Sequence, residues 1–352
     1  MLNLQSYLAS LTHRPPAHLV ICNDSADLDS VVCAAVWSWA VSANGHGRVL
    51  PVIPVPRSEL QLRREVIGHL DRCGIDPSGL LFSDSPALEP LLDHQKSTCT
   101  LVDHNGIPAV GQGNCQVTEI IDHHRDEGFH PDSRRTIEPV GSTATLLSRI
   151  ISSTSPELLD RTASLLLLGP ILLDTAGLGG SGGRTTEEDI RQASLLAKIS
   201  GSDVSALYEQ LSTELYDYSF LSTEQRLERD QKSYTLGTFR WTICSVGISL
   251  RSWLREEPDL PALMEKYRSR TSADLLAVMC RYEHRGFHRE LVLLGPHEQG
   301  LVEFLNCRGG FGLEKLGGPG QGCYLQKNTR CSRKELAPLI RHYVSALSDS
   351  SC

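Results

Sequence analysis

Asp122, His123 and His124 stand side by side at the end of an apolar run in the segment TEIIDHH (118–124). Carboxylates and imidazoles can bind metal ions or transfer protons, so these three residues could serve either chemistry. Taken alone, an aspartate that follows a strand is usually a turn or capping residue, and adjacent histidines are often surface residues. The triplet therefore needs support from other parts of the chain.

Three other segments show the same pattern, in which an apolar, strand-like run ends in acids or histidines. The candidate residues in LVICNDSADLDS, TLVDHN and LLGPILLDT are Asn23, Asp27, Asp29, Asp103, His104 and Asp174. Because the carboxyl ends of parallel strands lie along one edge of a sheet, we expect these side chains to converge. So many carboxylates would repel one another unless cations held them together.

Oxygen-rich ligands with a histidine or two favour Mg or Mn over metals that prefer thiolates. The acids are too many for one ion, and two ions could share a carboxylate and a water molecule whose pKa falls. Successive side chains at a strand end point to opposite sides, so one of His123 and His124 can bind metal while the other faces a substrate. The sequence therefore predicts a site for two divalent cations, Mg or Mn.

The elements that must position these residues alternate along the first two hundred positions. Apolar runs predict strands at 18–23, 49–53, 80–83, 99–104, 117–124 and 136–140. Helical patterns follow at about 30–43, 58–70 and 143–152. This alternation indicates βαβ units and a largely parallel sheet, and hence the α/β class.

The pattern changes after about residue 200. A polar, helical stretch runs to about Lys232 and is followed by strand-like segments of a second sheet at 233–250, 274–284 and 289–296. An amphipathic helix at 332–347 closes the chain. We place the boundary near residue 213, which gives domains 1–212 and 213–352. Glycine-rich segments at 177–183 and 317–322 are expected to be loops.

Composition limits the partners and the compartment. A formal net charge of −8 argues against bulk binding to nucleic acid, because phosphate backbones select basic surfaces. Eleven cysteines without C-x-x-C spacing indicate reduced thiols in the cytoplasm. The N-terminus lacks the features of a signal peptide, and the longest apolar run, 165–173, is too short to span a membrane. We therefore expect a cytoplasmic protein without a membrane span.

The motifs NDSADLDS, VDHN, IDHH, GSTATL and ILLDT resemble, in order and spacing, those of the DHH phosphoesterase superfamily. LSTEQRLERDQK and SRKELAPL resemble the DHHA2-type second domain of the branch that holds family II pyrophosphatases, exopolyphosphatases and prune proteins. The resemblance spans nearly the whole chain, and LSTEQRLERDQK is most similar to animal prune proteins. It implies a parallel-sheet DHH domain, a smaller α/β DHHA2 domain, and an active site in the cleft between them.

Carried over residue by residue, the resemblance implies two metal sites that share Asp103. The first would be held by Asn23, Asp27 and Asp103, and the second by Asp29, Asp103, His123 and Asp174. Pyrophosphatases of this group have a histidine where this chain has Asn23, whereas exopolyphosphatases and prunes resemble it in having asparagine. An amide oxygen is a neutral and weaker ligand, so we expect the first metal to be held more loosely.

The resemblance also implies the groups that bind the substrate. His124 would face the transferred phosphate, and Lys232, Arg333 and Lys334 would clamp substrate oxygens from the second domain. The basic segment QKNTRCSRK (326–334) agrees with such a clamp. The implied activity is exopolyphosphatase, a hydrolase acting on acid anhydrides, with short-chain inorganic polyphosphate such as tri- or tetrapolyphosphate as substrate. A hydroxide that bridges the two cations would attack the terminal phosphorus.

Two alternatives remain open at this point. The prune resemblance also implies cyclic-nucleotide phosphodiesterase activity, but with 6% aromatic residues no aromatic sandwich for a base is visible. It further implies a signalling role through protein partners, as in the prune family. Some animal prunes lose the last histidine of the triplet, whereas this chain keeps His124, which favours catalysis.

Overall fold

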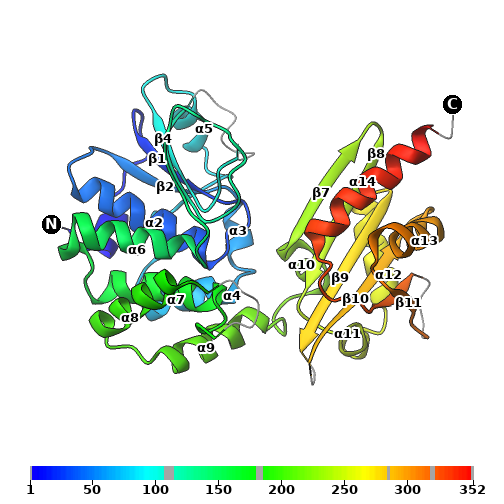
Figure 1. Cartoon of the computed structure of the whole chain (residues 1–352). Coiled ribbons are helices and arrows are strands. Elements are labelled where there is room, and N and C mark those ends of the chain that lie inside the picture. The colour runs from blue at the N-terminus through cyan, green and yellow to red at the C-terminus, as the bar shows by residue number, and fades with distance from the viewer. Residues whose placement is uncertain (1, 107–114, 180–184, 284–285, 318–321, 350–352) are drawn as a thin grey trace. The chain divides into compact units, whose positions relative to one another are not determined.

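A computed structural model describes residues 2–106, 115–179, 185–283, 286–317 and 322–349. The chain divides into two compact units, Met1–Leu215 and Tyr216–Cys352 (Figure 1). Both contain a sheet with helices, so the predicted α/β class is confirmed. Of the expected glycine-rich loops, residues 180–183 and 318–321 lie outside the described residues.

The first unit is built on a six-stranded sheet in which every strand pair is parallel. Its order is β3-β2-β1-β4-β5-β6. The strands are β1 (His18–Cys22), β2 (Val49–Ile53), β3 (Leu81–Phe82), β4 (Thr98–Val102), β5 (Gln116–Asp122) and β6 (Arg134–Ile137). The chain builds the sheet outward from β1 to one side, and then from β4 to the other side. The topological switch point, where α/β sheets bind ligands, therefore lies between β1 and β4.

Helices cover both faces of this sheet. They are α1 (Leu4–Ala9), α2 (Leu28–Ala43), α3 (Arg57–Leu60), α4 (Arg64–Arg72), α5 (Leu88–Leu92), α6 (Thr143–Thr154), α7 (Arg161–Asp174), α8 (Glu187–Ser200) and α9 (Val204–Tyr216). Leucines of α5 pack on one face, and α2, α6 and α7 belong to the larger core on the other. Strands buried on both faces explain why the sequence shows continuous apolar runs there.

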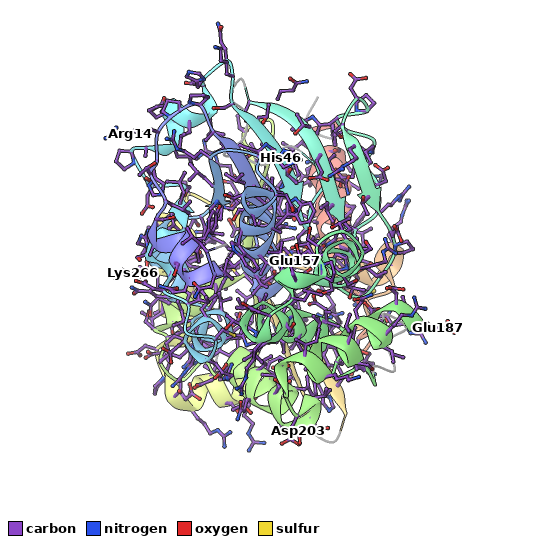
Figure 2. All side chains as sticks on the ribbon, turned by 90° about the vertical axis from the view of Figure 1, so that its left-hand side faces the viewer. Arg14, His46, Glu157, Glu187, Asp203 and Lys266 are labelled. Carbon is purple, nitrogen blue, oxygen red and sulfur yellow. The ribbon has the colours of Figure 1, made fainter. Side chains whose placement is uncertain are left out.

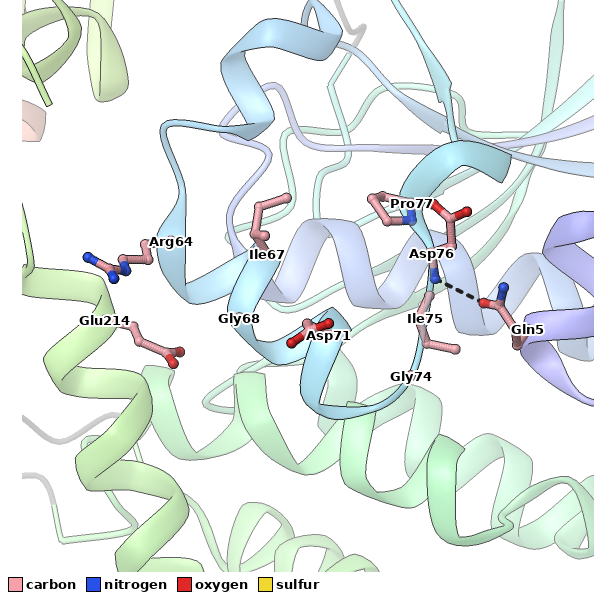
Figure 3. Close-up of a pocket in the computed structure, with 10 residues that line it drawn as sticks. All are labelled: Gln5, Arg64, Ile67, Gly68, Asp71, Gly74, Ile75, Asp76, Pro77 and Glu214. Atoms are coloured by element: carbon pink, nitrogen blue, oxygen red, sulfur yellow. Dashed lines mark hydrogen bonds between the residues drawn. The ribbon is translucent and has the colours of Figure 1, made fainter. Parts of the chain in front are cut away.

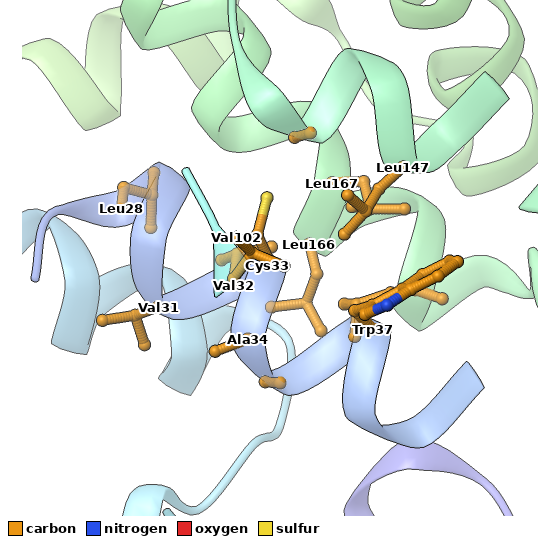
Figure 4. Packing of buried hydrophobic residues seen from close by; sticks show 14 of the residues in the cluster. Leu28, Val31, Val32, Cys33, Ala34, Trp37, Val102, Leu147, Leu166 and Leu167 are labelled. Carbon is orange, nitrogen blue, oxygen red and sulfur yellow. The ribbon is translucent and has the colours of Figure 1, made fainter. Parts of the chain in front are cut away.

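Helix α2 is the central element of the larger core. Figure 4 shows its residues Cys33 and Trp37 on the side of Leu147 of α6 and Leu166 of α7, while Val31 points away from these leucines within the same core. All five side chains are buried. A helix that is apolar on nearly all sides must be enclosed, and here the sheet and two helices enclose it. This packing fixes the start of α2 against the carboxyl edge of the sheet.

The apolar run that ends in Asp174 is a helix, so the strand-like interpretation of this segment is wrong. Helix α7 contains Pro170, which has no N–H to donate to the carbonyl of Leu166. His69 of α4 compensates, because its Nε2 lies 3.2 Å from that carbonyl. A Cβ atom at Gly169 would lie 2.4 Å from the same nitrogen, so only glycine permits this approach. Asp174 therefore reaches the site from the end of a helix.

The prediction of a single helix at 58–70 is also wrong, because α3 and α4 are separated by a break at residues 61–63. Arg63, which is buried, explains the break. Its guanidinium donates to the carbonyl of Ser25 through Nε at 2.8 Å and through Nη2 at 2.5 Å. The chain thus breaks its helix where Arg63 holds the loop between β1 and α2.

The second unit contains a six-stranded sheet of order β11-β12-β10-β9-β8-β7. Its strands are β7 (Gln231–Leu236), β8 (Phe239–Val246), β9 (Leu275–Glu283), β10 (Phe287–Leu294), β11 (Leu313–Lys315) and β12 (Cys323–Gln326). Only the β8–β9 pair is parallel within the described residues. The helices are α10 (Thr223–Arg229), α11 (Leu250–Glu256), α12 (Leu260–Arg270), α13 (Glu298–Gly309) and α14 (Arg333–Asp349). Helices α13 and α14 share one core with the sheet (Figure 1).

Charged side chains extend from the surface, and Figure 2 marks acidic examples at Glu157, Glu187 and Asp203. Such residues agree with the net charge of −8. Within the described ranges, no helix combines the length and the apolar character that crossing a bilayer requires.

Candidate metal centre

Asp103 follows β4 directly and occupies an unusual backbone conformation, with a φ of +64°. Left-handed conformations cost free energy for residues other than glycine and concentrate at functional sites. Two backbone hydrogen bonds stabilise this conformation of Asp103. Its N–H donates to the carbonyl of Ile121 at 3.0 Å, and the carbonyl of Asp103 accepts from Asn23 Nδ2 at 3.0 Å. The ends of β1, β4 and β5 are thereby tied together around Asp103.

Asp103 is 2% exposed, and its carboxylate lies among donors from three segments. Its Oδ2 accepts from Ser30 Oγ at 2.6 Å, and its Oδ1 accepts from Thr143 Oγ1 at 3.3 Å. His123 Nε2 lies 3.4 Å from Oδ1. These neighbours come from α2, α6 and the end of β5, so the carboxylate stands at the point where the predicted motifs meet.

His123 is oriented as a metal ligand would be. Its Nδ1 lies 3.1 Å from the carbonyl of Val140 and can donate a hydrogen bond to it. In the neutral ring with the proton on Nδ1, the lone pair of Nε2 faces Asp103. One ligand atom each from Asp103, His123 and His124 lies within 4.8 Å of the others. The structure therefore brings together three of the residues predicted from sequence.

His124 is held by the first residue of the triplet. Its Nδ1 lies 2.8 Å from Oδ1 of Asp122, which also accepts from the backbone N–H of His124 at 3.1 Å. Asn105 completes the arrangement, because its Nδ2 donates to Asp122 Oδ2 at 2.5 Å. The hydrogen bond to Asp122 raises the pKa of His124, although burial opposes it. Asp122 thus holds His124 in place and favours its cationic form.

The remaining predicted acids of the first unit differ in their surroundings. Asp29 is buried, and its carboxylate accepts from Ser142 Oγ and from the backbone N–H groups of Thr143 and Ala144 at 2.7–2.9 Å. Asp27 is exposed and caps α2 by accepting from the N–H of Ser30 at 3.1 Å. Both acids therefore have local structural roles beside any role at a metal.

Asn23 and Asp174 complete the predicted set. The amide oxygen of Asn23 accepts from the N–H of Ser25 at 3.0 Å, while its nitrogen holds the Asp103 carbonyl. Oδ2 of Asp174 is buried and has no hydrogen-bond donor among the described residues. Burial, together with the charges of Asp29 and Asp27, raises the pKa of Asp174 well above its ordinary value.

The electrostatics of the group show an excess of negative charge. Burial and the charge of Asp29 raise the pKa of Asp103 to about 7. Burial alone would lower the pKa of His123, but its contact with Asp103 and the charge of Asp29 raise it to about 10. A buried acid oxygen without a donor and an imidazole drawn toward its cationic form are both suited by a positive ion. The residues therefore fit a divalent cation.

Three clamp residues were predicted in the second domain. Lys232 does not end a helix as the sequence pattern suggested, because α10 ends at Arg229 and Lys232 lies on the edge strand β7. Arg333 begins α14 and donates to the carboxylate of Asp230 at 2.5 Å. Lys334 is exposed. Arg333 and Lys232 thus both lie near the start of β7.

Several residues that hold the site were missed by sequence reasoning. Ser30 and Thr143 contact Asp103, Asn105 contacts Asp122, and Arg63 holds the loop after β1. The motifs NDSADLDS, VDHN and GSTATL contain the first three, so a motif search could find them. Arg63 carries no such signal, because its partner is a backbone carbonyl.

A surface pocket of about 600 Å³ lies elsewhere on the first unit (Figure 3). Arg64, Asp71 and Glu214 line it, and Gln5 accepts from the N–H of Asp76 at its edge at 3.0 Å. None of the predicted metal or substrate residues lines this pocket. We therefore assign the candidate site to the group around Asp103.

Fold and site together define an α/β protein with a candidate divalent-metal centre at the switch point of a parallel sheet. Two known domain families match this chain. Residues 18–170 match the DHH family, N-terminal domain, and residues 209–343 match the DHHA2 domain. Human exopolyphosphatase PRUNE1 is 30% identical over 362 residues, which cover 99% of this chain and 80% of that protein. The chain therefore belongs to the DHH phosphoesterase superfamily, in its prune and exopolyphosphatase branch with a DHHA2 domain.

The chain is also similar to proteins of other organisms. A putative exopolyphosphatase of Schizosaccharomyces pombe is 29% identical, with 98% of this chain and 96% of that protein covered. The manganese-dependent inorganic pyrophosphatase of Bacillus subtilis is 28% identical over 56% of this chain and 64% of that protein. A structure of a putative family II inorganic pyrophosphatase from Methanococcus jannaschii has a TM-score of 0.66 at 20% identity, and covers 93% of this chain and 99% of that one. The structural match shows a shared fold.

Proposed function

We propose that this chain is a metal-dependent exopolyphosphatase that hydrolyses the terminal phosphoanhydride bonds of short inorganic polyphosphates. The observation that carries the proposal is the group of Asp103, His123 and His124 at the switch point of the first sheet. In this proposal residues 1–212 bind the metals, and residues 213–352 bind the substrate.

The reaction class rests on the relatives of the chain. Relatives that match nearly the whole of this chain are named exopolyphosphatases, and a relative that matches 56% of it is named an inorganic pyrophosphatase. Both names describe hydrolases that act on acid anhydrides. Family membership therefore makes this chain a hydrolase of the same class, while the choice among phosphoanhydride substrates belongs to the proposal.

We assign two divalent cations, Mg or Mn, to the group around Asp103. One would be held by Asn23, Asp27 and Asp103, and the other by Asp29, Asp103, His123 and Asp174. When bound, such ions supply a nucleophile from water near neutral pH and neutralise phosphate charge. Oδ2 of Asp174, which has no donor within the described part of the chain, supports its place in the set, because a buried carboxylate oxygen requires a donor or a cation.

His124 is suited to contact the substrate rather than the metals. Because its Nδ1 faces Asp122, a protonated His124 can donate from Nε2 to a phosphate oxygen. Such a donor stabilises charge that grows on that oxygen as the bond to phosphorus breaks. Lys232, Arg333 and Lys334 of the second unit would bind the remaining phosphate oxygens as cations.

Two features favour short chains as substrates. Asn23 is a neutral ligand, so a substrate with more phosphate oxygens should compensate for a weakly held metal better than pyrophosphate does. The net charge of −8 also disfavours an extended basic track along which a long polyphosphate could bind. Together they favour tripolyphosphate and tetrapolyphosphate.

A substrate panel tests this proposal. We expect the highest kcat/KM for tripolyphosphate or tetrapolyphosphate when phosphate release is measured with Mg or Mn. Pyrophosphate and long-chain polyphosphate should give lower values, and long chains should inhibit. Cyclic AMP serves as the test of phosphodiesterase activity. A higher kcat/KM for long-chain polyphosphate or cyclic AMP than for tripolyphosphate would contradict the proposal.

A further inference from the structure

Two arginines of the second unit face each other across neighbouring strands. Arg281 on β9 and Arg289 on β10 are direct partners in the antiparallel register. Directly opposed residues share one face of a sheet, with Cα atoms about 4.5–5.5 Å apart. Like charges in such a position destabilise the pairing. The pair therefore works against the stability of the sheet unless a ligand uses it.

The described surroundings do not neutralise this pair. Arg281 makes no hydrogen bond or ion pair within the described residues, and its Nε is buried without an acceptor. Arg289 donates Nε to the carbonyl of Thr329 at 2.9 Å. Burial lowers the pKa of the Arg289 guanidinium, and the charge of Arg281 lowers it further. Glu335 and Cys331 act in the opposite direction but do not outweigh burial and the charge of Arg281.

The arginine pair lies on the same face of the sheet as Lys232. Ile243 of β8 is the register partner of both Lys232 and Ala277, so these three side chains share a face. Side chains alternate along a strand, and Arg281 lies four residues beyond Ala277 on β9. Arg281 and Lys232 therefore point to the face that α14 covers.

The start of α14 lies near the same end of the sheet. Arg333 donates to Asp230, whose carbonyl accepts from the N–H of Ser245 at 2.8 Å. Ser245 pairs with Met279, which precedes Arg281 by two residues, or about 7 Å along a strand. The pair thus extends the proposed clamp toward the β9–β10 hairpin.

We propose that Arg281 and Arg289 form an anion-binding site for phosphate groups of a polyphosphate beyond those that the clamp holds. The identity of the ligand rests on the proposed function. A phosphate between two guanidinium groups would remove their repulsion and accept charge-assisted hydrogen bonds from Arg281, whose guanidinium has no acceptor among the described residues. The site would favour substrates with three or more phosphates over pyrophosphate.

Binding measurements on the full chain test this site. Arg281→Gln and Arg289→Gln are compared with Arg240→Gln, which removes one charge from an exposed position near the other end of β8. We expect each of the first two changes to weaken tripolyphosphate binding by about tenfold or more, and pyrophosphate binding by less than about threefold. Calorimetry in metal-free buffer gives both affinities.

Thermal unfolding separates this role from a structural one. Because Arg281→Gln removes a like-charge contact, its Tm should equal or exceed that of the wild type, which a purely structural arginine would not allow. Arg281→Lys keeps the charge but loses the two-pronged geometry, so we expect an intermediate affinity. This variant preserves the test if the glutamine variant does not fold.

Two results would overturn the assignment: no tripolyphosphate binding by the wild type, or equal binding by Arg281→Gln, Arg289→Gln and Arg240→Gln. If the wild type binds tripolyphosphate through these arginines but releases no phosphate, the anion site stands and the proposed hydrolase activity fails. The binding and turnover measurements therefore separate the two proposals.

Discussion

Replacing Asp103 by asparagine should abolish phosphate release from tripolyphosphate, with a loss of at least about a hundredfold in kcat/KM. Asp103 is the carboxylate that both proposed metals share, and asparagine keeps its shape while removing its charge. The change should not unfold the protein, because one of the Ser30 and Thr143 hydroxyls can still donate to the amide oxygen and the other can accept from the amide nitrogen. Phosphate release by the purified variant, at saturating Mg or Mn, measures the effect.

The same variant should be more stable than the wild type when metal is removed. Burial and the charge of Asp29 raise the pKa of Asp103 to about 7, so the folded state keeps a proton that the unfolded chain releases near pH 4. The metal-free wild type therefore loses stability as pH rises from about 4 to about 7. Asp103→Asn should show a higher Tm at pH 8 in chelator, and no such advantage at pH 4.

Asp93→Asn is a matched control, since Asp93 is exposed at the end of α5. It makes the same chemical change away from the site and should alter neither activity nor Tm. Asp103→Asn activity above about a tenth of the wild-type value would refute the role of Asp103 as the shared ligand.

Replacing each of the two adjacent histidines should impair a different step, metal binding for His123 and turnover for His124. His123→Ala removes the nitrogen that faces Asp103, so we expect Mn affinity to fall by about tenfold or more. His124→Ala should leave Mn affinity within about threefold of wild type but lower kcat by about 10²–10³, because it removes a donor to the substrate. Calorimetric titration of the chelator-treated proteins with Mn, followed by turnover assays, separates the two effects.

His46→Ala removes an exposed histidine of the first unit (Figure 2) and is the control for the loss of an imidazole. His46→Ala should change neither the Mn affinity nor kcat. Equal losses of Mn affinity in His123→Ala and His124→Ala would show that both histidines bind metal, and the proposed division of roles would be wrong.

Much of this fold is visible in the sequence because both faces of the first sheet are buried. The runs that became β1 and β4 are largely apolar and buried, β5 is buried in its second half, and the polar residues at their ends mark the edge where ligands bind. The apolar run before Asp174 was wrongly predicted as a strand because it too is buried on all sides. An apolar stretch of that length fits a buried helix as well as a buried strand, and periodicity does not separate them.

The contacts that hold the site could not be predicted from local sequence. Asp29 accepts hydrogen bonds from the start of α6, more than a hundred positions away, and Arg63 binds a backbone carbonyl. Neither contact leaves a pattern of spacing. The edge strand that carries Lys232 was also hidden, because a short strand with exposed polar residues resembles the end of a polar helix.

The central claim is that the group around Asp103 binds two divalent cations per chain. Elemental analysis after equilibrium dialysis against excess Mn tests it directly, with protein concentration fixed by amino-acid analysis. We predict two Mn ions per wild-type chain and fewer than two per chain of Asp103→Asn under the same conditions. One ion or none per wild-type chain, or two ions retained by Asp103→Asn, would contradict the account.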